Sequence, residues 1–129
     1  MSLMQSGQSL ADAVALLNTA PWVRPSYAEL RRACDESILL YVQRPTDDKV
    51  VGVLRAITDK VTVTYLCDLF VLPSQRHRGW GSVLVRKLLE HRHVRGTTVV
   101  LLTQGAETFY RKFGFTERAA MVRRPDAQS

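Results

Sequence analysis

The feature that most constrains this chain is a long strand that runs into a glycine turn and then into a helix. The stretch from Val61 to Leu72 is rich in β-branched and aromatic residues, as strands are. Pro73 ends this strand, because proline offers no amide to a β-ladder. Two glycines follow, and from Gly81 to about His93 apolar residues recur at the spacing of a helix with one buried face. The chain must therefore make a sharp turn between a strand and an amphipathic helix.

The remaining patterns predict one mixed α/β (α+β) domain that covers residues 1–129 and is built on one central sheet. Ser26 and Glu29 have the spacing of a capping box at the start of a helix. The apolar run 98–103 is typical of a buried strand that is covered on both faces. The other expected helices and strands are a helix over Ser9–Thr19 capped by Ser9, helices over Ser26–Cys34 and Ala106–Phe113, strands over Ile38–Gln43, Val50–Ile57 and Thr98–Thr103, and a final strand that opens at Phe115.

The net charge of +6 indicates an anionic partner, such as nucleic acid, a membrane surface or a phosphorylated cofactor. Nucleic acid is disfavoured, because aromatic and basic residues are not interleaved and no recognition motif is present. No apolar run approaches the length of a membrane span. Cys34 and Cys67 fit no metal-binding spacing, so no metal is expected, and with no visible signal peptide a reduced, cytoplasmic setting is the simplest expectation.

The glycine turn has the parts of an anion-binding site. The first amides of a helix have no partners within the helix, and the helix dipole adds partial positive charge there. Gly79 and Gly81 allow a close approach of the backbone, and Arg76 and Arg78 add full charges. A Walker A loop is excluded because the turn lacks Gly-Lys-Ser/Thr, and a Rossmann fingerprint is disfavoured because Leu84 stands where its third glycine belongs. The alternative that the glycines merely make the turn stays open at this point.

The segment from Val71 to Val85 resembles the acyl-CoA signature of the GNAT N-acetyltransferase superfamily, Gln/Arg-x-x-Gly-x-Gly/Ala after a Val-x-Pro strand end. Arg76, Gly79 and Gly81 match this signature in register, whereas His77 stands where many members have glycine. The segment from Ala106 to Phe115 resembles the late helix of the same family, Ala-x-x-x-Tyr-x-x-x-Gly-Phe. Two motifs in the right order strengthen each other.

The resemblance implies a GNAT-like mixed central sheet with a splayed, bulged strand and about four flanking helices. It also implies acetyl-CoA as cofactor and direct transfer of its acetyl group to a primary amine of a small molecule or a protein. The acceptor pocket would be built by residues 21–36, Trp22 among them, and by C-terminal residues, and Trp22 is as well explained as a core or loop anchor. The implied cofactor-binding residues are the turn (Arg76, His77, Arg78, Gly79, Trp80, Gly81, Ser82), the strand backbone (Leu69, Phe70, Val71), and Thr103 or Gln104 in place of an Asn that many members have.

Two residues are candidates for the proton transfers. By the resemblance, Tyr110 would protonate the departing thiolate, although Phe109, Tyr110 and Phe113 could instead form an aromatic core. Asp68 would act as the base. Alternation along a strand places it on one face with Leu66 and Phe70, which predicts a raised pKa or a charged partner. The alternative for Asp68 is a hydrogen bond to a backbone amide at the bulge.

Other functions stay open at the level of sequence. A non-catalytic acyl-CoA-binding or sensing module would account for His77 and for the missing Asn. A basic nucleic-acid-binding module would account for the charge alone. A homodimer is also expected, because the terminal strands look short and a sheet edge would need cover.

Overall fold

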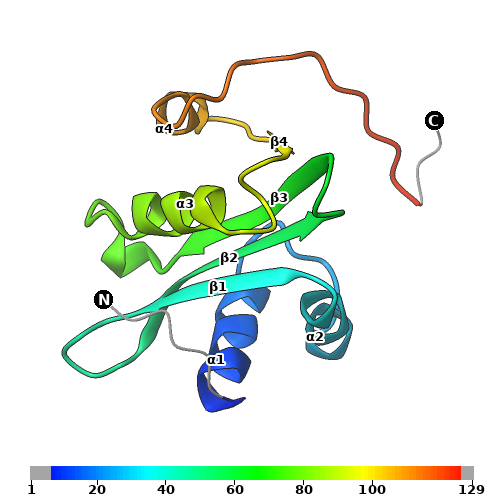
Figure 1. Cartoon of the computed structure of the whole chain (residues 1–129). Coiled ribbons are helices and arrows are strands. Elements are labelled where there is room, and N and C mark those ends of the chain that lie inside the picture. The colour runs from blue at the N-terminus through cyan, green and yellow to red at the C-terminus, as the bar shows by residue number, and fades with distance from the viewer. Residues whose placement is uncertain (1–6, 126–129) are drawn as a thin grey trace.

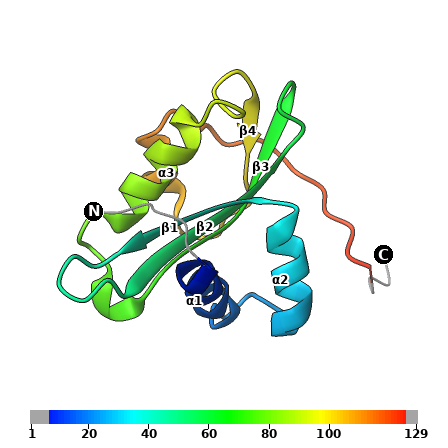
Figure 2. The same cartoon turned by 60° about the horizontal axis from the view of Figure 1, so that its bottom comes forward.

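The computed structural model describes residues 7–125, so residues 1–6 and 126–129 of the predicted domain lie outside the described residues. The chain forms a four-stranded mixed sheet in the order β1-β2-β3-β4, with helices on both faces (Figure 1). Helices α1 and α2 cover one face, and α3 and α4 cover the other (Figure 2). The predicted fold class, a mixed α/β domain with one central sheet and about four helices, is confirmed.

The first two helices form as their sequences predict. Helix α1 (Gly7–Asn18) begins two residues before Ser9, which therefore lies within the helix rather than at its cap. Helix α2 (Tyr27–Asp35) begins after Ser26. The Ser26 hydroxyl accepts a hydrogen bond from the Glu29 amide, and the Glu29 carboxylate accepts one from the Ser26 amide. The capping box is therefore present as predicted.

Strands β1 (Ile38–Gln43), β2 (Val50–Thr58) and β3 (Val63–Val71) form an antiparallel meander, and β4 (Thr98–Val100) pairs in parallel with the first residues of β3. The prediction of a buried strand over residues 98–103 is wrong in extent and in burial. Pairing stops at Val100, and Val100 and Leu102 are 44% and 51% exposed because β4 is an edge strand. No strand follows Phe115 within the described residues, where 115–124 has no regular structure.

A β-bulge interrupts the pairing of β2 with β3. Arg55 pairs with Asp68 and Ala56 pairs with Leu66, so Cys67 is the extra residue. The bulge moves the side chains after it to the other face. Leu66 packs in the core under α3, whereas Phe70 packs in the core under α1 and α2. The prediction that Leu66, Asp68 and Phe70 share a face is therefore wrong, because strict alternation fails across a bulge.

The glycine turn connects β3 to α3 through a short 3-10 helix, η1 (Pro73–Gln75). Helix α3 (Trp80–Glu90) packs on the sheet through Leu84, Val85 and Leu88. Helix α4 (Glu107–Arg111) ends near Gly114, whose φ of 91° requires the left-handed region that glycine tolerates. Among the helices of residues 7–125, none is both long and apolar enough to cross a membrane.

Candidate active site

The candidate site is a groove at the point where β3 and β4 separate. Strand β4 pairs only with Val63–Tyr65, so within residues 7–125 no strand pairs with the later part of β3 on that side (Figure 1). The start of α3 lies across the end of β3. The resulting groove has a volume of about 580 Å³ and is lined by Trp22, Leu69, Phe70, Val71, Gln75, Arg76, His77, Gly79, Trp80, Gly81, Ser82, Phe109 and Lys112.

The open edge of β3 presents backbone groups to this groove. The Leu72 amide donates to the Val51 carbonyl, and backbone groups in an antiparallel ladder alternate in direction. The backbone N–H and C=O groups of Val71 and Leu69 therefore point away from β2. This direction is visible at Val71, whose carbonyl accepts a hydrogen bond from Arg76 Nε at 3.0 Å. Leu69 is left with an amide and a carbonyl that face the groove.

The start of α3 presents a set of amides that lack partners. The first hydrogen bond into the helix runs from the Val83 amide to the Gly79 carbonyl, so the amides of residues 80–82 have no acceptor in the preceding turn. Gly79 has φ 87°, and no side chain caps the helix. His77 also has a positive φ, 65°. This backbone angle gives the physical reason for glycine at that position in similar turns.

Two further donors lie beside these amides. The guanidinium of Arg76 is fixed by its bond to Val71 and lies 5.5 Å from the centre of the Phe70 ring. The Trp80 side chain is 8% exposed, and its Nε1 has no hydrogen-bond partner among the described residues. A buried donor without an acceptor costs stability, so this N–H favours a bound acceptor in the adjacent groove.

Tyr110 lies on α4 at the side of the groove but does not line it. Its ring packs edge-on against Phe109 at 5.0 Å and against Phe115 at 5.7 Å, and it is 8% exposed. Burial raises the pKa of Tyr110 to about 12. The hydroxyl is therefore protonated at neutral pH, as a proton donor must be. The neighbouring Phe109 and Lys112 line the groove.

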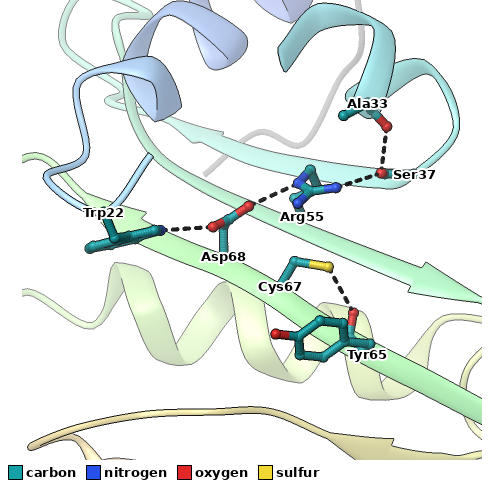
Figure 3. A network of polar contacts seen from close by, with 7 residues as sticks. All are labelled: Trp22, Ala33, Ser37, Arg55, Tyr65, Cys67 and Asp68. Carbon is teal, nitrogen blue, oxygen red and sulfur yellow. Dashed lines mark hydrogen bonds and ion pairs between the residues drawn. The ribbon is translucent and has the colours of Figure 1, made fainter. Parts of the chain in front are cut away.

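Asp68 is the centre of a polar network on the opposite face of the sheet (Figure 3). The Trp22 Nε1–H donates to Asp68 Oδ1 at 2.7 Å, and Arg55 Nε donates to Asp68 Oδ2 at 2.8 Å. Arg55 Nη1 also donates to the hydroxyl of Ser37, which donates to the Ala33 carbonyl. Asp68 is 8% exposed and has the charged partner that its position predicted. The alternative expectation for Asp68 was a hydrogen bond from a backbone amide. Its two oxygens instead accept from the side chains of Trp22 and Arg55.

The electrostatics around the bulge follow from burial and from this ion pair. Burial pulls the pKa of Arg55 down, whereas Asp68 and the nearby thiols raise it, and the net shift is upward. Burial raises the pKa of the Cys67 thiol, although Arg55 opposes that effect. A thiol with a raised pKa is a poor nucleophile. Cys67 and Asp68 both lie opposite Arg55, because the bulge places two residues of β3 against one residue of β2.

Three sequence-predicted cofactor residues do not line the groove. Thr103 and Gln104 lie in the loop between β4 and α4, and the exposed Arg78 lies in the turn. Within the described residues no group of three potential metal ligands is present.

A second cavity of about 400 Å³ lies on the α1 and α2 side. Residues 21–25 and Arg124 line it, together with Asp68 and Arg55. The family resemblance implied an acceptor pocket built from these same two parts of the chain, residues 21–36 and the C-terminal residues. Trp22 lines both this cavity and the groove, and its ring meets the Phe70 ring edge-on at 5.7 Å.

The fold and the groove define an acetyltransferase scaffold, and comparison with known proteins agrees. The family model described as the acetyltransferase (GNAT) family matches residues 8–115. The chain belongs to this family.

Individual relatives give the same result. A putative GNAT-family acetyltransferase from Xanthomonas campestris has a similar structure, with a TM-score of 0.81 and 29% identity over 93% of this chain and 90% of that one. A GNAT-family acetyltransferase from Streptococcus pneumoniae has a TM-score of 0.74 and 26% identity over 92% of each chain. An uncharacterized N-acetyltransferase of Methanocaldococcus jannaschii is 35% identical over 65 residues, which are 46% of this chain and 29% of that protein. This chain thus matches less than a third of that relative's length.

Sequence reasoning missed several residues that line these cavities. Arg55 is the lone charged residue of β2, and a buried strand with one arginine needs an anionic partner. That signal could have identified it. Gln75 and Phe109 line the groove without a comparable signal, because only the folded arrangement of the chain brings them there.

Proposed function

We propose that this chain binds acetyl-CoA in the groove and transfers the acetyl group to a primary amine. The observation that carries the proposal is the set of backbone amides at the start of α3, which have no acceptor in the preceding turn. They lie beside Arg76, in the groove where β3 and β4 separate. A pyrophosphate needs such donors, and positive charge at a helix start favours it. The family to which the chain belongs supports the same cofactor.

The residues present fit this cofactor. The amides of residues 80–82 and the charge of Arg76 would hold the pyrophosphate, with His77, Arg78 and Gly79 shaping the turn. The orphaned Nε1 of Trp80 is a further donor beside the groove. A Cβ placed on Gly79 would meet no atom within 4 Å, so the approach to the turn is open. Thr103 and Gln104 remain predicted contacts in the loop beside the groove.

When bound, acetyl-CoA supplies the acetyl group as a thioester that an amine can attack. In the net reaction a C–N bond replaces the C–S bond, the amine loses a proton and the sulfur gains one. The Leu69 amide on the open edge of β3 is positioned to donate a hydrogen bond to the developing negative charge on the carbonyl oxygen. Phe70 and Val71 form the adjoining wall.

Tyr110 is the proposed donor of the proton that the sulfur gains, because its hydroxyl is protonated at neutral pH and its ring contacts Phe109, which lines the groove. Asp68 is the proposed acceptor of the proton that the amine loses. Its two oxygens already accept from Trp22 and Arg55, so a proton would reach it through the remaining lone pairs or through water.

The test is calorimetric titration with acetyl-CoA, followed by detection of free thiol during incubation with a panel of primary amines. We expect binding, and thiol release that depends on the amine. Tyr110→Phe should keep the binding and lower kcat by roughly 100-fold, because it removes the proton donor. Tyr27→Phe is the matched control, because Tyr27 is exposed and lies outside both cavities.

Three outcomes would contradict parts of this proposal. Failure to bind acetyl-CoA removes the cofactor assignment. Binding without thiol release for any amine favours a non-catalytic acyl-CoA-binding module. Thiol release that is equal in Tyr110→Phe and in the native protein removes Tyr110 from the mechanism.

A homodimer and a cytoplasmic location also remain proposals. The exposed apolar residues at the β4 edge, Val100 and Leu102, support a second copy as cover for that edge. The free thiols of Cys34 and Cys67 support a reducing compartment.

A further inference from the structure

The second cavity differs in chemistry from the groove that the cofactor would fill. Its walls are formed in part by Pro21, Trp22 and Leu30. Its polar lining consists of Arg24, Arg55, Arg124 and Asp68. Three cationic side chains and one anionic side chain therefore face a space of about 400 Å³.

These charges do not balance. Arg55 and Asp68 neutralise each other across 2.8 Å. Arg24 and Arg124 are exposed, and neither makes an ion pair or hydrogen bond with any residue in the described range 7–125. Among residues 7–125, no acidic residue other than Asp68 lines the cavity. Within that range, the cavity thus holds two cations without counter-charge and one carboxylate that is already paired.

The position of the cavity connects it to the site of acetyl transfer. Trp22 lines both spaces, and its Nε1–H bonds Asp68 while its ring contacts Phe70. A molecule in the second cavity therefore lies next to the groove, with Trp22 between the two. Asp68 marks the end of the cavity next to the groove, where the remaining lone pairs of its carboxylate can accept a hydrogen bond from an amine, and the two free arginines mark where an anion is favoured.

We propose that the acceptor is a small primary amine that also carries an acidic group, a carboxylate or a phosphate, and that Arg24 and Arg124 bind this group. Guanidinium groups bind either anion through paired hydrogen bonds, so the shared chemistry is an oxyanion. The amine lies toward Asp68 and Trp22. This inference rests on the proposed acetyl transfer.

The test compares matched amines that differ in the acidic group. Phenylalanine is compared with 2-phenylethylamine, and O-phosphoethanolamine with ethanolamine, by thiol release from acetyl-CoA. We expect at least one acidic amine to exceed its neutral counterpart in kcat/KM by about tenfold or more, since each charge-assisted pair is strong. The pair that shows the larger ratio distinguishes carboxylate from phosphate.

Variants then assign the effect to the two arginines. Arg24→Gln combined with Arg124→Gln should raise KM for the preferred acidic amine by about tenfold or more and leave KM for its neutral counterpart unchanged. Arg123→Gln is the matched control, because it removes the same charge from the neighbouring position, which does not line the cavity. An equal loss in Arg123→Gln would show a general effect of charge and would overturn the assignment.

The outcomes separate this inference from the function on which it rests. Efficient turnover of neutral amines, with no gain from the acidic group, overturns the inference and leaves acetyl transfer intact. If acetyl-CoA binds but no amine is acetylated, acetyl transfer itself is contradicted. Calorimetric titration with phenylalanine and with O-phosphoethanolamine then decides the acid-binding site: binding that the double variant abolishes supports it, and no binding overturns it.

Discussion

At the scale of single residues, His77 is the position where the turn is under strain. Its φ of 65° lies in the left-handed region, which costs a residue with a Cβ about 1 kcal/mol or more. Glycine removes this cost and adds chain entropy to the unfolded state. We expect His77→Gly to be neutral or to raise the free energy of unfolding by about 1 kcal/mol in urea titrations.

Arg78→Gly is the control for His77→Gly, because Arg78 lacks a positive φ. This substitution also raises the chain entropy of the unfolded state, but it relieves no strain. We therefore expect it to lower the free energy of unfolding by about 0.5–1 kcal/mol. A His77→Gly variant that is less stable than Arg78→Gly would show that the imidazole stabilises the turn by a contact and is not a source of strain.

The buried Tyr110 makes a prediction about pH. In the folded protein its pKa is about 12, whereas a phenol in the unfolded chain has a pKa near 10. A group whose pKa is raised on folding stabilises the protein below the unfolded value and ceases to do so as pH rises toward the folded value. Between about pH 10 and pH 12 the native protein should therefore lose about 2 kcal/mol more than Tyr110→Phe in denaturant titrations. Parallel pH profiles of the two proteins would contradict this, and Tyr27→Phe again serves as control.

At the scale of elements, the approach of α3 to the sheet depends on Gly52 in β2. A Cβ at this position would lie 3.0 Å from Val42 Cγ2 and 3.2 Å from Leu84 Cδ1. Both neighbours are fully buried, so neither can move away freely. We expect Gly52→Ala to lower the free energy of unfolding by about 1–2 kcal/mol. Gly96→Ala, where a Cβ meets nothing within 4 Å, should be neutral or slightly stabilising, and equal effects of the two variants would contradict the packing argument.

At the scale of the whole molecule, the sheet separates two chemically different spaces. The groove opens where β3 leaves β4, and the basic cavity lies on the face covered by α1 and α2. The network from Ser37 through Arg55 and Asp68 to Trp22 joins the turn before β1, strand β2 and strand β3 to the loop between α1 and α2. Trp22 lines both spaces, and it is held by the hydrogen bond from its Nε1–H to Asp68 and by the edge-on contact of its ring with Phe70.

The amino-acid sequence by itself determined the order of most elements and the place of the glycine turn. Local patterns are sufficient for these: a capping box places the start of α2, Pro73 ends β3, and Gly79 and Gly81 make the turn before α3. The motif match grouped Arg76, Trp80 and Ser82 with Leu69, and all four residues line the groove. The family followed from the same residues.

The tertiary structure alone decided which residues meet across the bulge and across the two faces of the sheet. The extra residue at Cys67 reverses the side-chain alternation, and no local signal in the sequence marks a bulge. It sets Asp68 against Arg55 and Trp22, which are 13 and 46 residues away in the chain. It was also the fold that left β4 as a short exposed edge, since an apolar run has the same sequence pattern whether or not another element covers it. Periodicity records which side chains are apolar, and packing decides what each of them touches.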